Sequence, residues 1–176
     1  LIVADVAFPG IEWLHPIAVV ILYIGLASYA ILLPVMLYRL FFYASIQTGA
    51  QPTIAIMAAP ASLSLAGYLS VVNEPNLLLC AVLLGIAILM TVAIYFAFWR
   101  LLRLQFSPGY AAFTFPMAIG ATALYKAAKA LADIPGALEY ERTLRLIAHA
   151  ELAVAALVIF YVLALYLKNF KDFLPK

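Results

Sequence analysis

The chain has 176 residues, of which 68% are hydrophobic and only 10% are charged, and its mean hydropathy is +1.12. Soluble domains typically have charged residues near a quarter of their total. This composition therefore excludes an ordinary soluble domain and predicts an integral membrane protein. The formal net charge of +2 is too small to suggest a nucleic acid as a partner.

Five long apolar segments follow one another along the chain and predict five transmembrane helices. Each is long enough to cross a hydrocarbon core of about 30 Å, and none shows the alternating pattern of a barrel strand. We therefore expect one all-α, polytopic transmembrane domain over residues 1–176. The predicted helices cover residues 16–40, 53–72, 77–103, 109–131 and 143–168.

The chain begins without methionine, in a short apolar run that Asp5 interrupts. We expect this run to be the end of an earlier helix. The sequence would then be the C-terminal half of a longer protein, whose preceding half is absent here or supplied by another chain.

An internal repeat relates the second and fourth predicted helices. Pro52 precedes the second helix and Pro60 lies within it, and Pro108 and Pro116 have the same spacing around the fourth helix. The first proline of each pair suits a helix start, where its missing N–H costs nothing. The second removes a backbone hydrogen bond, which a membrane helix tolerates only where its surroundings satisfy the freed carbonyl. We therefore expect two kinked helices.

Each kinked helix is followed by a regular one, so the repeating unit is predicted to be a hairpin. The kinked helix 53–72 is rich in alanine, serine and glycine, which permit close approach of neighbouring backbones. The regular helices 77–103 and 143–168 are rich in bulky apolar residues that suit lipid. We expect the kinked helices inside the bundle, around a cavity, and the regular helices outside.

One face of the fourth helix has two interpretations. At helical spacing Phe115, Ile119, Thr122, Lys126 and Lys129 fall along one side. The first interpretation is a narrow apolar throat with a cationic mouth. The second is a kinked core helix whose terminal lysines reach the membrane interface.

The sequence around these prolines resembles the tellurite-resistance/C4-dicarboxylate transporter family, which includes slow anion channels of plant guard cells. The matching stretches are Phe113-Thr114-Phe115-Pro116-Met117 with Pro108 ahead of it, together with Pro52-Thr53 and Ala58-Ala59-Pro60. The resemblance implies ten helices in five hairpins, with kinked inner helices around a central pore and trimers of separate pores. The present chain would supply helices six to ten, in a bacterial inner membrane.

The resemblance also implies a gate, because pores of this family are closed by a phenylalanine on an inner helix. Phe115 matches that position best, and Phe113 is the fallback. We expect Lys126 and Lys129 to attract anions to the mouth of the pore. The predicted pore-lining residues are Pro60, Ser64, Thr114, Pro116, Ile119 and Thr122.

These features predict a channel for passive conduction of small anions, gated by a phenylalanine. The alternative is a secondary transporter or exporter of C4-dicarboxylates or of sulfite- or tellurite-type oxyanions. Coupled transport usually shows an ionisable group near the membrane midplane, and the first four predicted helices have none there. A third possibility is a purely structural membrane subunit, which would conduct nothing.

The remaining polar residues give weaker indications. His149 and Glu151 lie early in the last predicted helix, where they suggest either a proton relay or a solvated helix start. The four-residue spacing of Glu141, Arg145 and His149 favours the solvated start with ion pairs. No catalytic grouping, metal-ligand spacing or phosphate-binding loop stands out, so we expect no enzymatic activity, cofactor or metal.

Overall fold

The computed structural model describes residues 2–42, 47–132 and 134–170. Within these ranges the chain is almost entirely helical and contains no strand, which confirms the predicted all-α class. We denote α-helices by α and 3₁₀ helices by η. The elements are α1 (Ile2–Val6), η1 (Glu12–Leu14), α2 (His15–Phe42), η2 (Thr48–Ala58), α3 (Ala59–Val71), α4 (Leu77–Leu101), η3 (Pro108–Phe113), α5 (Thr114–Ala132) and α6 (Leu138–Lys168).

Four stretches of helix in the described chain are long and apolar enough to cross a membrane, which confirms a polytopic bundle. They are Glu12–Phe42, Gly49–Val71, Leu77–Leu101 and Leu138–Lys168. The fifth predicted span, η3 with α5, is outside this set, and the two lysines of α5 lower its hydropathy. That η3 and α5 cross the membrane therefore stays a prediction.

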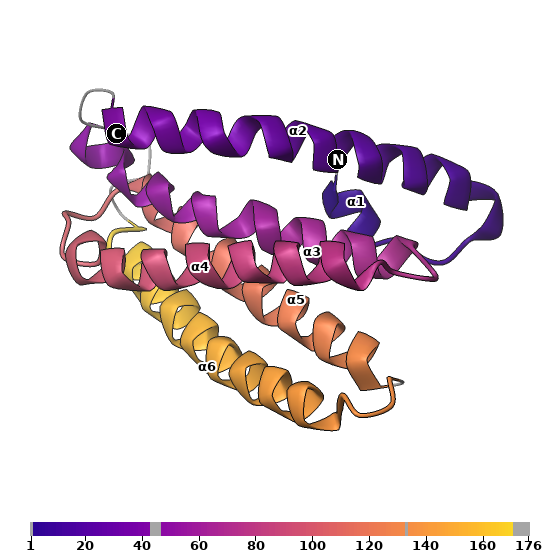
Figure 1. Cartoon of the computed structure of the whole chain (residues 1–176). Helices are drawn as coiled ribbons and strands as arrows, with labels where there is room; N and C mark the ends of the chain where they lie inside the picture. Colours follow the sequence, from indigo (N-terminus) through magenta and orange to yellow (C-terminus); the bar gives the residue numbers. More distant parts are fainter. Residues whose placement is uncertain (1, 43–46, 133, 171–176) are drawn as a thin grey trace.

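The elements are arranged around α3. Figure 1 shows α2, α3 and α4 running alongside one another, with α5 and α6 as a slanted pair below them. Helix α3 packs against α1, α2, α4 and α5, while α6 packs mainly on α5. The segments with a proline pair thus lie between the regular helices.

Burial separates inner helices from outer ones. In the apolar window of Gly49–Val71, 61% of residues are buried, against 17–22% in the windows of the other three spans. Helix α5 buries nine of its 19 residues, whereas α6 buries six of 31. The expected placement of the helices with a proline pair inside and the regular helices 77–103 and 143–168 outside is therefore what the structure shows.

The second proline of each pair marks a change of winding. The tight 3₁₀ helix η2 gives way to α3 at Ala59, and η3 gives way to α5 at Thr114. Pro60 and Pro116 consequently lie in the first turn of an α-helix, where the N–H groups have no partner within the helix. The strain expected at these prolines is relieved by starting a new α-helix there.

Polar contacts hold the ends of the inner helix α3 and its neighbours. The side chain of Asn76 accepts hydrogen bonds from the N–H groups of Leu78 and Leu79, at 2.9 and 3.2 Å, and so caps α4. The backbone N–H of Asn76 in turn donates to the hydroxyl of Tyr68 on α3. These bonds fix the tight α3–α4 hairpin.

Candidate functional site: the two faces of helix α5

One side of α5 is not covered by the described part of the chain. Phe115 is 47% exposed, Lys129 is exposed, and Thr122 and Lys126 are half-buried. We call these four residues the open face of α5. They include the predicted gate, the predicted mouth and one predicted lining residue, so the structure brings these residues together along one side of an inner helix.

Lys126 is tied to the neighbouring inner helix. Its Nζ atom donates a hydrogen bond of 2.6 Å to Oγ of Ser70 on α3, and that hydroxyl donates to the carbonyl of Ala66 at 2.6 Å. Lys129, one turn further on, is exposed. The open face therefore ends in one anchored cation and one exposed cation.

The other predicted lining residues divide into two groups. Pro60 and Thr114 are half-buried, and Thr114 donates its hydroxyl hydrogen to the carbonyl of Ala111 at 2.8 Å. Ser64, Pro116 and Ile119 are buried between the helices of this chain. Ile119 is thus covered by neighbouring helices, although helical spacing placed it on the same side of α5 as Phe115. Pore lining by any of these residues stays a prediction.

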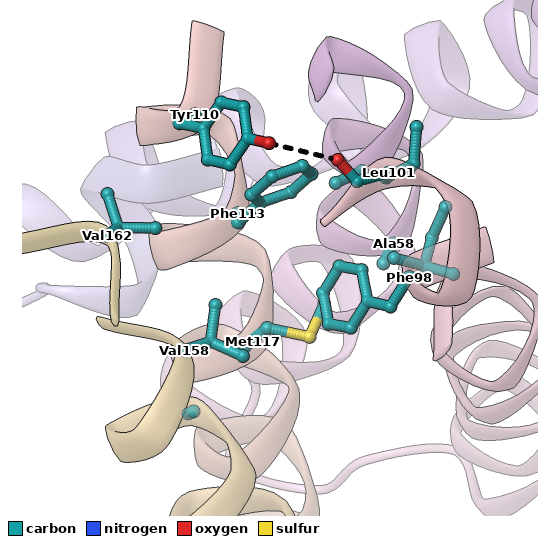
Figure 2. Close-up of a cluster of buried hydrophobic side chains, with 11 residues drawn as sticks. Ala58, Phe98, Leu101, Tyr110, Phe113, Met117, Val158 and Val162 are labelled. Atoms are coloured by element: carbon teal, nitrogen blue, oxygen red, sulfur yellow. Dashed lines mark hydrogen bonds between the residues drawn. The ribbon is translucent and has the colours of Figure 1, made fainter. Parts of the chain in front are cut away.

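Phe113 lies in a different environment from Phe115. Figure 2 shows its ring in a buried cluster between Tyr110 and Phe98, with side chains of η2, α4 and α6 around it. It is 0% exposed and meets both rings edge-on, with centroids 5.1 Å from Tyr110 and 5.4 Å from Phe98. The Tyr110 hydroxyl reaches the carbonyls of Leu104 and Leu101 at 2.6 and 3.3 Å. Phe113 is therefore a core residue of the helical bundle described here.

The opposite side of α5 faces Glu151, which the sequence analysis named with His149 as either a proton relay or part of a solvated helix start. Glu151 of α6 is only 8% exposed, and its Oε2 atom has no hydrogen-bond partner. It lines a small cavity together with Ser62 of α3, Thr91 of α4 and Gly120 of α5. Its burial does not fit the solvated helix start that the sequence analysis favoured for this residue.

Of its neighbours on α6, Arg145 and His149 are exposed as the solvated interpretation expected, whereas Glu141 is buried. Arg145 forms an ion pair with Glu141 one turn earlier. The exposed His149 packs edge-on against the ring of Tyr125 on α5, with centroids 5.3 Å apart. However, α6 begins at Leu138, ahead of the predicted start at 143, so Glu151 lies deeper in the helix than the sequence suggested.

A family model described as a voltage-dependent anion channel matches residues 3–167 of the chain. No curated protein and no solved structure matches the chain significantly. In the described ranges, no group of histidine, cysteine, aspartate and glutamate residues could hold a metal ion. The family match covers every helix named above except the ends of the first and last.

Proposed function

Because the chain belongs to the voltage-dependent anion channel family, as its resemblance predicted, we propose that it conducts small anions passively along the open face of α5. The observation that carries this proposal is the half-exposed Phe115 on an otherwise well-buried inner helix. An apolar ring in this position is suited to closing a narrow path by excluding water. Displacement of the ring would then open the path.

The charges of the open face support an anion as the permeant species. Lys126 and Lys129 lie beyond Thr122 at the end of α5, where they would raise the local concentration of anions. Between Phe115 and Lys126 the open face contains Thr122 and no fixed charge. Weak binding in that stretch favours rapid passage, since conduction requires that ions leave a site as readily as they enter.

The other residues that line the anion path would belong to a part of the protein outside this sequence. We propose that a preceding half of the same protein covers the open face and completes a central pore of ten helices. The family resemblance further supports a homotrimer in the bacterial inner membrane, with the lipid bilayer against α2, α4 and α6. In this proposal the protein is not an enzyme and uses neither a cofactor nor a nucleic acid. The family resemblance also suggests tellurite resistance as a physiological role of the protein.

Coupled export of C4-dicarboxylates or of sulfite- or tellurite-type oxyanions is the second candidate. The buried carboxyl group of Glu151 favours it, because ionisable groups inside membrane helices often take part in proton transfer. Phe115 would then be part of a gate in a transporter, and anion movement would depend on a proton gradient.

A flux assay on the full-length protein in liposomes tests the proposal and separates the two candidates. A chloride gradient is applied with no proton gradient, and then with a proton gradient in each direction. We expect a flux that follows the chloride gradient alone. Accumulation of the anion against its own gradient, driven by protons, would contradict passive conduction. The absence of any flux would favour a structural subunit.

A further inference from the structure

Glu151 lies near the middle of α6, far from either end. It is 13 residues after Leu138 and 17 before Lys168, so about 20 Å and 26 Å of helix separate it from the two ends. More than nine-tenths of the residue is buried, and Oε2 has no hydrogen-bond partner. A carboxyl group in this position is far from the aqueous ends of the helix.

The absence of a side chain at Gly120 makes room for this carboxyl group. A Cβ atom added to Gly120 would lie 2.6 Å from Oε2 of Glu151 and 3.8 Å from Oγ1 of Thr91. The cavity between them has a volume of about 10 Å³ and is otherwise lined by Ser62 and apolar side chains. The polar groups that share the cavity with Glu151 are thus two hydroxyls, which can accept a hydrogen bond but cannot balance a charge.

Three cations of α5 and α6 are either bonded to other groups or exposed. Arg145, on α6, is paired with Glu141. Lys126, on α5, donates its hydrogen bond to Ser70, and Lys129 is exposed at the end of the same helix. None of these three side chains forms an ion pair with Glu151 in the described structure.

The other titratable side chains on the helices around Glu151 do not neutralise it either. His149 of α6 is exposed and packs on Tyr125 of α5. Tyr68 of α3 accepts a hydrogen bond from the backbone of Asn76. The buried hydroxyl of Tyr95 on α4 has no hydrogen-bond partner, so it forms no bond with Glu151. An unpaired carboxylate is costly in such surroundings, and a buried group normally becomes neutral instead.

We propose that Glu151 is a proton-binding site in the middle of the bundle, occupied when α5 and α6 are packed as they are here. The polar groups that line the cavity with this carboxyl are the hydroxyls of Thr91 and Ser62, which suit a neutral carboxyl better than a charged one. Release of this proton to solvent leaves a carboxylate that must gain water or a cation. The packing of α5 on α6 at Gly120 therefore changes with the protonation of Glu151.

This site also gives the anion path a means of responding to pH, a consequence that rests on the proposed function. Gly120 lies about one turn beyond Pro116, on the same helix as Phe115. A change of packing behind α5 would be transmitted along that helix to the open face. The protonation of Glu151 would thus bias the position of the Phe115 ring.

Infrared spectroscopy of the full-length protein in liposomes tests the proton site without any measurement of conduction. The carbonyl stretch of a protonated carboxyl group is followed through a pH titration in wild type, Glu151→Gln and Asp5→Asn. Asp5 is the matched control because it is 1% exposed and also has an unpartnered carboxyl oxygen, but lies on α1. We expect Glu151→Gln to remove one component of the protonated-carboxyl band at neutral pH, and Asp5→Asn to leave that component in place. A wild-type spectrum identical to that of Glu151→Gln at neutral pH would overturn the proposal.

Anion flux through the same samples tests the consequence separately. We expect flux through the wild type to vary with pH across the range in which the Glu151 band disappears. The flux through Glu151→Gln should be insensitive to pH in that range. A band that behaves as expected, together with no flux in any sample, would refute the proposed conduction and leave the proton site standing. A flux with equal pH dependence in both proteins would refute the link between Glu151 and the path.

Discussion

At the start of α5, two phenylalanines only two residues apart have different surroundings. Phe113 is 0% exposed and packs within the aromatic cluster, whereas Phe115 is 47% exposed on the open face. The sequence restricted the gate to these two positions and favoured Phe115 by its resemblance. Burial gives an independent physical reason for the same choice, because a fully packed ring cannot swing aside without leaving a cavity in the core.

Tyr110 stabilises the same cluster with its hydroxyl group. That hydroxyl lies 2.6 Å from the carbonyl of Leu104 and 3.3 Å from that of Leu101, at the end of α4. Replacing Tyr110 by phenylalanine keeps the ring and removes the hydrogen bond, so we expect a loss of about 0.5–1.5 kcal/mol of stability. Thermal unfolding in detergent measures it, with Tyr140→Phe as the control at a 70% exposed position. Equal unfolding temperatures for the two variants would contradict this assignment.

The lysines of the open face should act through their charge. Replacing both Lys126 and Lys129 by glutamine is expected to lower anion flux mainly at low ionic strength, because salt screens exposed charges over about 10 Å at 0.1 M. Lys168→Gln is the control, since it removes a cation from the far end of α6. A double variant whose flux matches wild type at every salt concentration would show that the lysines do not attract the permeant anion.

At the scale of elements, the proline pairs predicted the position of the breaks but not their form. Sequence spacing indicated kinks at Pro60 and Pro116. The structure instead has the 3₁₀ helices η2 and η3, which pack against each other and lead into α3 and α5. Winding of this kind depends on the tertiary surroundings of the helix, and a single sequence pattern does not encode them.

The contact between Gly120 and Glu151 links α5 to α6 and can be measured by a double-mutant cycle. Gly120→Ala alone places a methyl group 2.6 Å from the carboxyl oxygen and should lower the unfolding temperature by displacing the Glu151 side chain. In a Glu151→Ala background the same methyl group has room, so its cost should fall. We expect a coupling of about 0.5–3 kcal/mol. Additive effects of the two substitutions would mean that the side chains do not meet as described.

At the scale of the whole molecule, composition and repeats were sufficient for the membrane class and for the division into inner and outer helices. The family match over residues 3–167 confirms the resemblance drawn from the proline-containing motifs. The buried position of Glu151 was not predicted. The start of α6 was placed at 143 instead of Leu138, and the side of α6 that faces α5 follows only from packing. Local pattern indicates which segments are helices, whereas burial of one side chain depends on contacts distant in sequence.

The gate is the central claim, and paired alanine variants of Phe115 and Phe113 test it most directly. Anion conductance and the thermal unfolding midpoint are measured for both variants of the full-length protein in the same lipid. Phe113→Ala should lose about 3–5 kcal/mol of stability, because it empties a packed core position, and should stay closed. Phe115→Ala should remain close to wild type in stability and show a much larger anion conductance. A destabilised Phe115→Ala variant that stays closed would contradict the account.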